Sequence, residues 1–329
     1  MSSFSVARLM SKRRRPVPNA AEQPDRSVGS TPRRSPRRLA TRLALGTGAL
    51  FFGAAAVVYA VSEGHAVRRV DVPTHHLVVR DASATRARGA HLVAARGCVG
   101  CHGADLAGRV ELDEPLIGRV AGPNLTRGGR GAALTDADWE RAVRHGVRRD
   151  GTPLFVMPSQ EHATMSDEDL GAIVAHARSA EPRPDAPPPS RPGPVLRLME
   201  ATDQVQLYPA RKIDHSRPHP TRMRPAPTPE YGAYLASMCA GCHGERFGGG
   251  PIPGAPPSWK PAANLTPAGL GHYSAEDFVR ALRTAVRPDG STIDPSMPVA
   301  SIARHIDDLE LRALYAYLRT LPPRPYGTR

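Results

Sequence analysis

The chain has 329 residues, of which 40% are hydrophobic and 5% aromatic, and its formal net charge is +13. This length is enough for two domains of ordinary size. The charge does not indicate a nucleic-acid partner, because residues 1–61 hold 11 Lys and Arg against 2 Asp and Glu and so account for +9 of it. No nucleic-acid-binding motif is present, and the basic excess is interpreted as a topology signal.

The N-terminal region predicts a membrane anchor. Residues 1–42 form a basic tail that we expect to be disordered and cytoplasmic. Residues 43–61 are 19 uncharged residues, long enough for a hydrocarbon core of about 30 Å. Five arginines between Arg33 and Arg42 precede them, so the positive-inside rule places the remaining chain outside the cytoplasm. A cleaved signal peptide, ending near Ala60, is the alternative, but the tail and the apolar run are both longer than is typical of one.

All four cysteines lie in two identically spaced motifs, Cys98-Val99-Gly100-Cys101-His102 and Cys239-Ala240-Gly241-Cys242-His243. The C-x-x-C-H spacing is typical of haem c attachment, in which each sulfur bonds one vinyl group and the histidine ligates the iron. A zinc or dithiol site is the alternative, but it leaves both histidines unexplained and must join segments far apart in the sequence. The motifs therefore predict two covalently attached haems c, held by Cys98, Cys101, His102, Cys239, Cys242 and His243.

One methionine follows each motif at a matched distance. Met157 follows His102 at almost the same sequence separation as Met297 follows His243. Methionine is a common second axial ligand of haem c, although a single methionine is often core filler. The matched positions predict His/Met ligation in both halves. Among the other histidines, His162 is the nearest competitor of Met157, while His215 and His219 are expected to be solvated.

The motifs belong to an internal repeat of about 140 residues. Asn124-Leu125-Thr126 and Asn264-Leu265-Thr266 precede the methionine of their half by the same sequence separation. Each half predicts a helix before its motif, one in the middle and one at the end, the last two opened by capping-box patterns. These patterns begin at Thr135, Ser166, Ser274 and Asp307. We therefore predict two helical domains, over residues 82–180 (the first half) and 228–322 (the second half).

A proline-rich connector, residues 181–229, joins the halves and contains 13 of the 35 prolines. This composition favours extended, semi-rigid backbone. The stretch from Val195 to Tyr208 is too apolar for a free linker. We expect it to pack against one of the halves and to help fix the distance between the haems.

Each half resembles a class I cytochrome c domain, an all-α fold around one haem. The resemblance implies that an early and a late helix cross beside the haem and that the methionine lies in a loop before the last helix. It also implies that a proline carbonyl, at Pro123, contacts the proximal histidine; Ala263 stands at the matching position, where this contact is less secure. The predicted fold is all-α, two tandem class I cytochrome c domains after a single N-terminal transmembrane helix.

A membrane-tethered pair of His/Met haems predicts a one-electron relay, not an enzyme, with no catalytic residues. The pattern is similar to cytochrome c subunits of membrane-bound alcohol and sugar-acid dehydrogenases, which commonly carry a third haem. This resemblance implies a bacterial inner-membrane protein with periplasmic haems, and a dehydrogenase subunit, a quinol-linked complex or a terminal oxidase as redox partner. The alternative is a di-haem cytochrome c peroxidase-type enzyme, which needs an iron with an open sixth position; a haem-based sensor or assembly factor is a third possibility.

Overall fold

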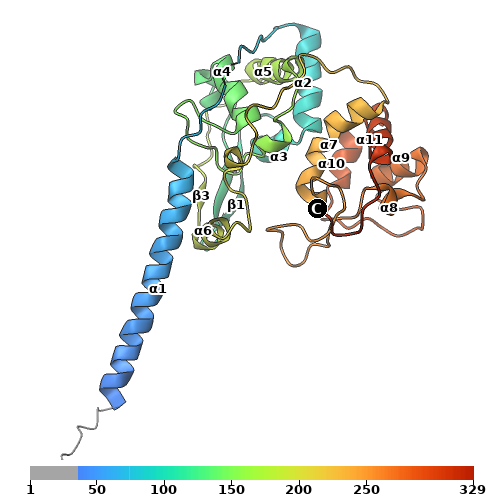
Figure 1. Cartoon of the computed structure of the whole chain (residues 1–329). Helices are drawn as coiled ribbons and strands as arrows, with labels where there is room; N and C mark the ends of the chain where they lie inside the picture. Colours follow the sequence, from blue (N-terminus) through green and yellow to red (C-terminus); the bar gives the residue numbers. More distant parts are fainter. Residues whose placement is uncertain (1–35, 74) are drawn as a thin grey trace, which may run out of the picture. The chain divides into compact units, whose positions relative to one another are not determined.

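The computed structural model describes residues 36–73 and 75–329. It has two compact units, Met1–Phe52 and Gly53–Arg329, and the second unit contains both halves. The fold is mostly helical, as predicted (Figure 1). Most of the expected N-terminal tail, residues 1–35, lies outside the described residues, whereas residues 36–42 are helical and were wrongly assigned to the tail.

Helix α1 (Pro36–Val67) is the long N-terminal helix in Figure 1. Its segment Leu39–Val67 is long and apolar enough to cross a membrane. The helix extends beyond the predicted span at both ends, because no proline interrupts it after its first residue. Large apolar side chains point outward along it; Leu50 is 75% exposed and Phe52 73%. Such a surface suits lipid better than water.

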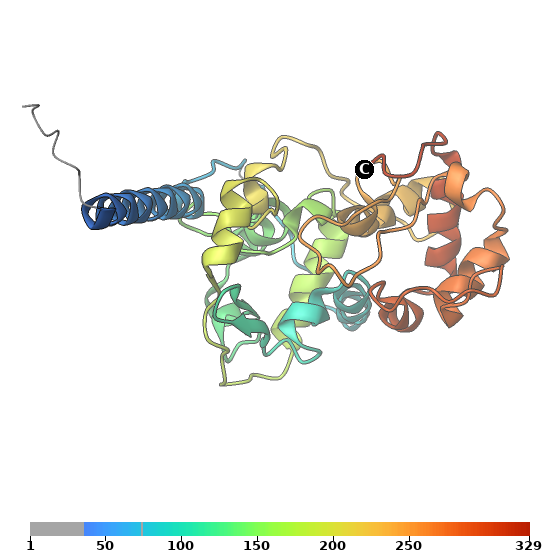
Figure 2. The ribbon, with the colours of Figure 1, turned by 90° about the horizontal axis from the view of Figure 1, so that it is seen from below.

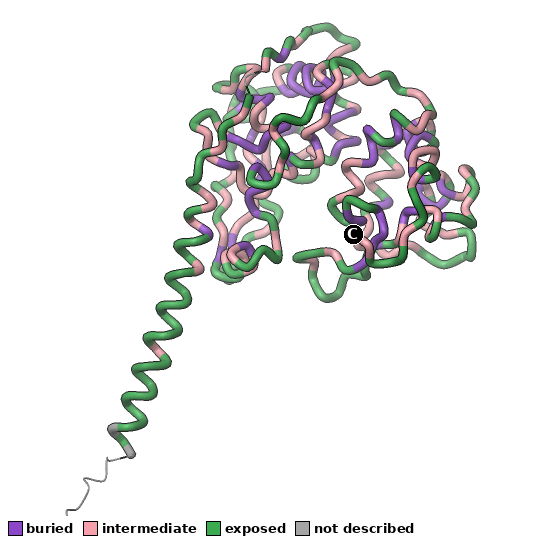
Figure 3. Tube along the Cα trace, viewed as in Figure 1, coloured by how far each residue is buried: buried purple, intermediate pink, exposed green. Residues whose placement is uncertain are grey.

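The first half is built around two crossed helices, α2 (Ser83–Ala95) and α5 (Asp167–Ser179). They approach closely at a glycine, since a Cβ added to Gly89 would lie 2.0 Å from the carbonyl oxygen of Ala172. Their buried side chains form one core, which Figure 3 shows as purple segments. The other helical elements are α3 (Cys98–His102), η1 (Arg130–Ala133), α4 (Asp136–Glu140), its π-helical continuation η2 (Arg141–His145) and η3 (Ser159–Glu161).

The second half repeats this arrangement with α7 (Pro229–His243) and α11 (Asp308–Thr320). The crossing again uses a glycine, because a Cβ on Gly232 would lie 1.9 Å from the carbonyl oxygen of Ala313. Helix α7 continues through the second motif, whereas Gly97, with φ 77°, separates α2 from α3 in the first half. The remaining helices are α8 (Pro267–Leu270), α9 (Ala275–Thr284) and α10 (Val299–His305).

The predicted helix starts are confirmed. Thr135, Ser274 and Asp307 form complete capping boxes with the residue three positions later. Ser166 also caps its helix by accepting from the backbone N–H of Asp169. The Asp169 carboxylate does not complete the box, because it accepts hydrogen bonds from Tyr234 and Arg88 instead.

A small antiparallel sheet interrupts the otherwise helical first half and was not predicted. It has the order β1 (Arg109–Glu114), β2 (Gly118–Gly122) and β3 (Arg191–Pro192). The β1–β2 hairpin begins soon after the first motif and returns the chain to it, since a Cβ on Gly122 would lie 2.0 Å from the carbonyl oxygen of Cys101. The sheet thus places the segment after β2 beside His102.

The connector carries α6 (Pro194–Ala201) and η4 (Pro209–Arg211). Leu207 and Tyr208 are buried at 5% exposure each. The backbone N–H of Val156 donates to the carbonyl oxygen of Leu207 at 2.7 Å. The expectation that this stretch packs against one of the halves is therefore met, and it contacts the loop that bears Met157.

The two halves lie side by side in both views of the ribbon (Figures 1 and 2). Contacts join α2 to α10 and η3 to α7. At this junction the Tyr234 hydroxyl donates to Asp169 at 2.8 Å and accepts from the backbone N–H of Ser166 at 3.1 Å. Glu310 contacts His91 at 2.8 Å and accepts from the Tyr231 hydroxyl at 3.2 Å. These buried polar contacts hold the halves in one unit.

Candidate haem sites

Both motif histidines are oriented by a backbone carbonyl. The Nδ1 of His102 donates to the carbonyl oxygen of Pro123 at 2.9 Å, and that of His243 to the carbonyl oxygen of Ala263 at 2.7 Å. The contact expected to be less secure at Ala263 is therefore present, because the carbonyl and not the side chain makes it. Burial lowers the pKa of both imidazoles. Each ring is thus held neutral with Nε2 available to a metal, as in many metal-ligating histidines.

The four cysteines are free thiols, with Cys98 and Cys239 on the more buried side of each motif and Cys101 and Cys242 exposed. Burial raises the pKa of Cys98 to about 11 and that of Cys239 to about 12. Burial thus disfavours the thiolate form that zinc binds. Within residues 36–73 and 75–329, the groups of side chains close enough to hold a metal contain no cysteine.

An apolar cavity brings the predicted residues of the first half together. Cys98, His102 and Met157 all contribute to its wall, so the structure brings these three predicted residues together. The rest of the wall suits the flat apolar haem macrocycle, and consists of Val93, Leu106, Leu125, Trp139, Val143, His162, Met165, Ile173 and Ala177.

His162, the histidine considered from the sequence as a competitor of Met157, also lines this wall. Its side chain is 3% exposed and its Nδ1 has no hydrogen-bond partner among the described residues. Burial lowers its pKa to about 3. His162, five residues after Met157 in the sequence, thus lines the first cavity together with it.

The two methionines occupy equivalent turns. Pro158 has φ −79° and ψ 54°, and Pro298 has φ −77° and ψ 52°. The backbone N–H after each proline donates back to the methionine carbonyl, at 2.8 Å in the first half and 2.7 Å in the second. Met297 and Cys239 pack against the same buried cluster of the second half. Both methionines therefore stand in the same local structure relative to their motif.

The Asn-Leu-Thr segments have a structural role that sequence reasoning missed. The Asn124 Oδ1 accepts from the backbone N–H of Thr126 at 2.9 Å and from its hydroxyl at 2.7 Å. Its Nδ2 donates to the carbonyl oxygens of Arg183 and Asp185, at 2.7 and 2.8 Å. In the second half Asn264 donates to the carbonyl oxygen of Arg324 at 2.8 Å. Each asparagine therefore ties the carbonyl-bearing segment beside the histidine to the chain that leaves the last helix.

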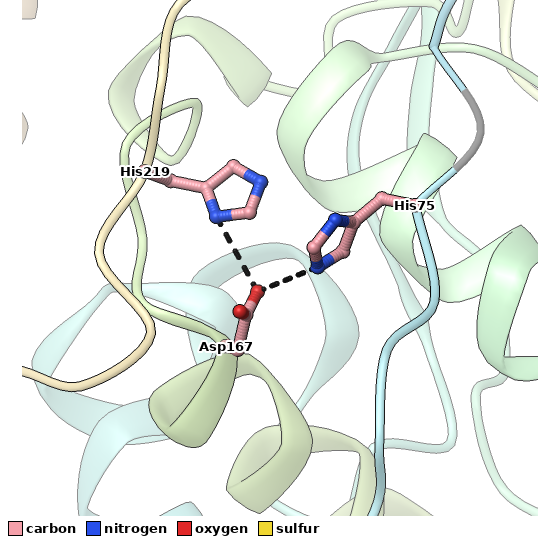
Figure 4. A group of neighbouring side chains, drawn as sticks. All are labelled: His75, Asp167 and His219. Carbon is pink, nitrogen blue, oxygen red and sulfur yellow. Dashed lines mark hydrogen bonds and ion pairs between the residues drawn. The ribbon is translucent and has the colours of Figure 1, made fainter.

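A separate cluster, His75, Asp167 and His219, also offers metal-ligating groups (Figure 4). Asp167 lies 3.0 Å from the Nε2 of His75 and 3.3 Å from the Nδ1 of His219. The fully buried Arg144 contacts the same Asp167 oxygen at 2.8 Å and the Nε2 of His219 at 3.2 Å. Because guanidinium N–H groups only donate, His219 must carry its proton on Nδ1, which blocks a metal there.

This cluster instead anchors the connector to the first half. His219 and His215 were expected to be solvated, and this expectation was wrong: both are partly buried and bonded. The reason is nonlocal, because both histidines contact η2 of the first half. His219 lies 3.2 Å from Arg144, and the Nδ1 of His215 lies 3.0 Å from the Nδ1 of His145.

Comparison with known proteins agrees with this geometry. Residues 84–176 match the family model described as cytochrome C oxidase, cbb3-type, subunit III, and residues 230–322 match cytochrome c. The chain is 30% identical over 282 residues to the alcohol dehydrogenase (quinone) cytochrome c subunit of Gluconacetobacter polyoxogenes, covering 74% of this chain and 57% of the relative. It is 28% identical over 270 residues to the fructose dehydrogenase cytochrome subunit of Gluconobacter japonicus, covering 72% and 52%.

The gluconate 2-dehydrogenase cytochrome c subunit of Pantoea cypripedii is 40% identical over 96 residues, covering 26% of this chain and 21% of the relative. This chain thus spans just over half the length of the first two relatives. The matched residues include both motifs and both methionines. The chain carries two cytochrome c domains and is related to proteins named as cytochrome c subunits of alcohol, fructose and gluconate dehydrogenases.

Proposed function

We propose that this chain relays single electrons between redox proteins through two haems c, each with one histidine and one methionine ligand. The observation that carries the proposal is the first cavity, where Cys98, His102 and Met157 share one apolar wall. The equivalent turns at Met157 and Met297 extend it to the second half. The proposed attachment and ligand residues are Cys98, Cys101, His102, Met157, Cys239, Cys242, His243 and Met297.

When bound, haem c supplies a reversible one-electron couple. The chain's own residues attach, orient and shield that group. The carbonyls of Pro123 and Ala263 fix the tautomer of the two histidines, and such bonds raise the basicity of the ligating nitrogen. The apolar wall of the cavity excludes water, so that water does not replace the histidine or the methionine as a ligand. This work needs neither a general base nor a nucleophile.

A peroxidase-type enzyme is less well supported. Peroxide needs an iron with an open or displaceable sixth position, and each half instead offers a methionine in an ordered turn. The related proteins are named as cytochrome subunits of dehydrogenases. Electron transfer without substrate chemistry of its own agrees with both observations.

The partners follow from the relatives and from α1. We propose a dehydrogenase subunit as electron donor and a quinone-linked complex or a terminal oxidase as acceptor. Helix α1 would anchor the chain in the bacterial inner membrane, with both haems on the periplasmic side. The arginines before and within the first turns of α1, together with its apolar segment Leu39–Val67, support this orientation.

The haem content and peroxide reactivity of the detergent-solubilised full chain test the proposal. We expect two covalently bound haems per chain, both low-spin in the ferric state, and no change of spectrum with peroxide. Cys239→Ala should weaken covalent attachment at the second site alone. A single haem, or a high-spin haem that reacts with peroxide, would contradict the relay and favour the enzyme.

A further inference from the structure

The first half places a carboxylate directly on the second haem motif. Glu161 closes η3, four residues after Met157, and η3 contacts α7. A Cβ added to Gly241 would lie only 2.6 Å from the Oε1 of Glu161. Gly241 lies between the two cysteines of the motif, immediately before Cys242. The carboxylate therefore occupies the space that the missing side chain leaves.

This contact has no counterpart at the first motif. A Cβ on Gly100, the equivalent glycine, would meet nothing within 4 Å. The residue that matches Glu161 after the second methionine is Ser301, which carries no charge. The two halves therefore differ at this point: the Glu161 carboxylate of the first half contacts the motif of the second half, and Gly100 of the first motif has no such contact.

The Glu161 carboxylate is not compensated by a partner. Among the described residues it has no hydrogen bond or ion pair, and burial alone raises its pKa to about 7. The elements packed against η3 are η2, η4 and α7. The charge of Glu161 acts on the thiols of Cys239 and Cys242 in α7. The other charged or titratable groups of these elements, together with those that reach the same face of α7, are Arg141, Arg144, His145, Arg211, Glu230, Tyr231, Tyr234, His243, Arg96 and Arg329.

Arg96 is a buried cation near both motifs. It lies between the motifs, since it affects the thiols of both Cys98 and Cys239. Its guanidinium contacts the second half through the carbonyl oxygen of Tyr234 at 3.3 Å and the Tyr234 ring at 4.5 Å. It does not contribute to the environment of Glu161, for which burial is the single cause of the shift.

We propose that Glu161 is a proton-binding site of the second haem, taking up a proton from solvent when that haem accepts an electron from a redox partner. This inference rests on the proposed function. A ferric haem carries one more positive charge than a ferrous haem, so it favours the ionised carboxylate and lowers its proton affinity. Linkage is reciprocal, and the proton must therefore raise the electron affinity of the same haem.

The protonation of Glu161 makes the reduction potential of the second haem depend on pH. Below the pKa of Glu161 in the oxidised protein, the carboxyl is neutral in both redox states and the potential is constant. Above it, the reduced protein binds more protons, and the potential falls with rising pH until the carboxylate is ionised in both states. A tenfold difference in proton affinity between the two states corresponds to a total fall of 59 mV.

A redox titration of the full chain from about pH 5 to about pH 9, which brackets the pKa of Glu161, tests the proposal. The wave of the second haem is identified by Met297→His, because exchange of a methionine for a histidine ligand lowers that potential alone. We expect the second wave to fall with pH near neutrality. In Glu161→Gln, which keeps the shape of the side chain, that wave should be flat and should lie higher above pH 7.

Glu168→Gln is the matched control, because Glu168 is an exposed carboxylate of the first half, paired with Arg222 at 2.7 Å. It should leave both waves unchanged. In redox-difference infrared spectra, reduction should add a protonated-carboxyl band that Glu161→Gln lacks. If Glu161→Gln has two redox waves from two low-spin haems, but the potential of the second haem still falls with pH as in the unmodified chain, this inference alone is overturned. Absence of two such waves would overturn the proposed function and the inference with it.

Discussion

Replacement of Asn124 by alanine should lower the unfolding free energy of the first half far more than the loss of a few side-chain atoms alone would suggest. Asn124 is 1% exposed, and its amide makes four hydrogen bonds, two to Thr126 and two to the carbonyls of Arg183 and Asp185. Each buried bond contributes about 1 kcal/mol net, so the loss should be about 4 kcal/mol. The segment freed is the one whose carbonyl, at Pro123, holds His102.

Asn264→Ala is the matched comparison in the second half. That asparagine makes three such bonds. Because its side chain is only half-buried, each bond should contribute less than at Asn124, and the total loss should be about 2 kcal/mol. Urea unfolding of the ferric holoprotein, followed by the methionine-to-iron band of each haem, measures both. Equal losses in the two variants, or a loss below about 1 kcal/mol in Asn124→Ala, would refute the assignment of the asparagines as buried ties.

Three further predictions concern other contacts. Gly89→Ala and Gly232→Ala should each lower the free energy of unfolding by about 3 kcal/mol, because the added Cβ would lie 2.0 and 1.9 Å from a backbone oxygen. Thermal unfolding measures the loss. Gly64→Ala is the control, because a Cβ at Gly64 would meet nothing within 4 Å. Pro123→Ala should leave the potential of the first haem nearly unchanged, since the carbonyl remains; a large shift in voltammetry would contradict this role. The hydrogen bond to Glu310 raises the pKa of His91 in the folded protein. This contact between the halves should therefore stabilise the fold fully at a pH below the pKa of His91 in the unfolded chain, and the stabilisation should be lost as the pH rises through the pKa of His91 in the folded protein. In urea unfolding, His91→Phe should abolish this pH dependence.

The local features of the fold could be predicted from the sequence because neighbouring residues determine them. The caps at Thr135, Ser274 and Asp307 depend on a side chain three positions away. The histidine and cysteine positions follow from one pentapeptide. The match between Met157 and Met297 was visible because the chain repeats itself.

The features that escaped prediction depend on residues distant in sequence. The β1–β2 hairpin pairs Val110 with Ala121, and β3 comes from the connector. Asp169 leaves its capping box because Tyr234, 65 residues away, reaches it across the two halves. Nothing near Glu161 in the sequence indicates that it rests on Gly241. Such contacts become visible only when the two halves are packed together.

The central claim is that each haem has its own histidine and methionine ligands, and the most direct test removes the methionines one at a time. The measurement is the absorption and EPR spectrum of the ferric full chain, unmodified and as Met157→Ala and Met297→Ala. We predict two low-spin haems, with each variant losing the sulfur-to-iron charge-transfer band of one haem and leaving the other intact. A variant that loses neither band, or an unmodified chain with a high-spin haem, would contradict it.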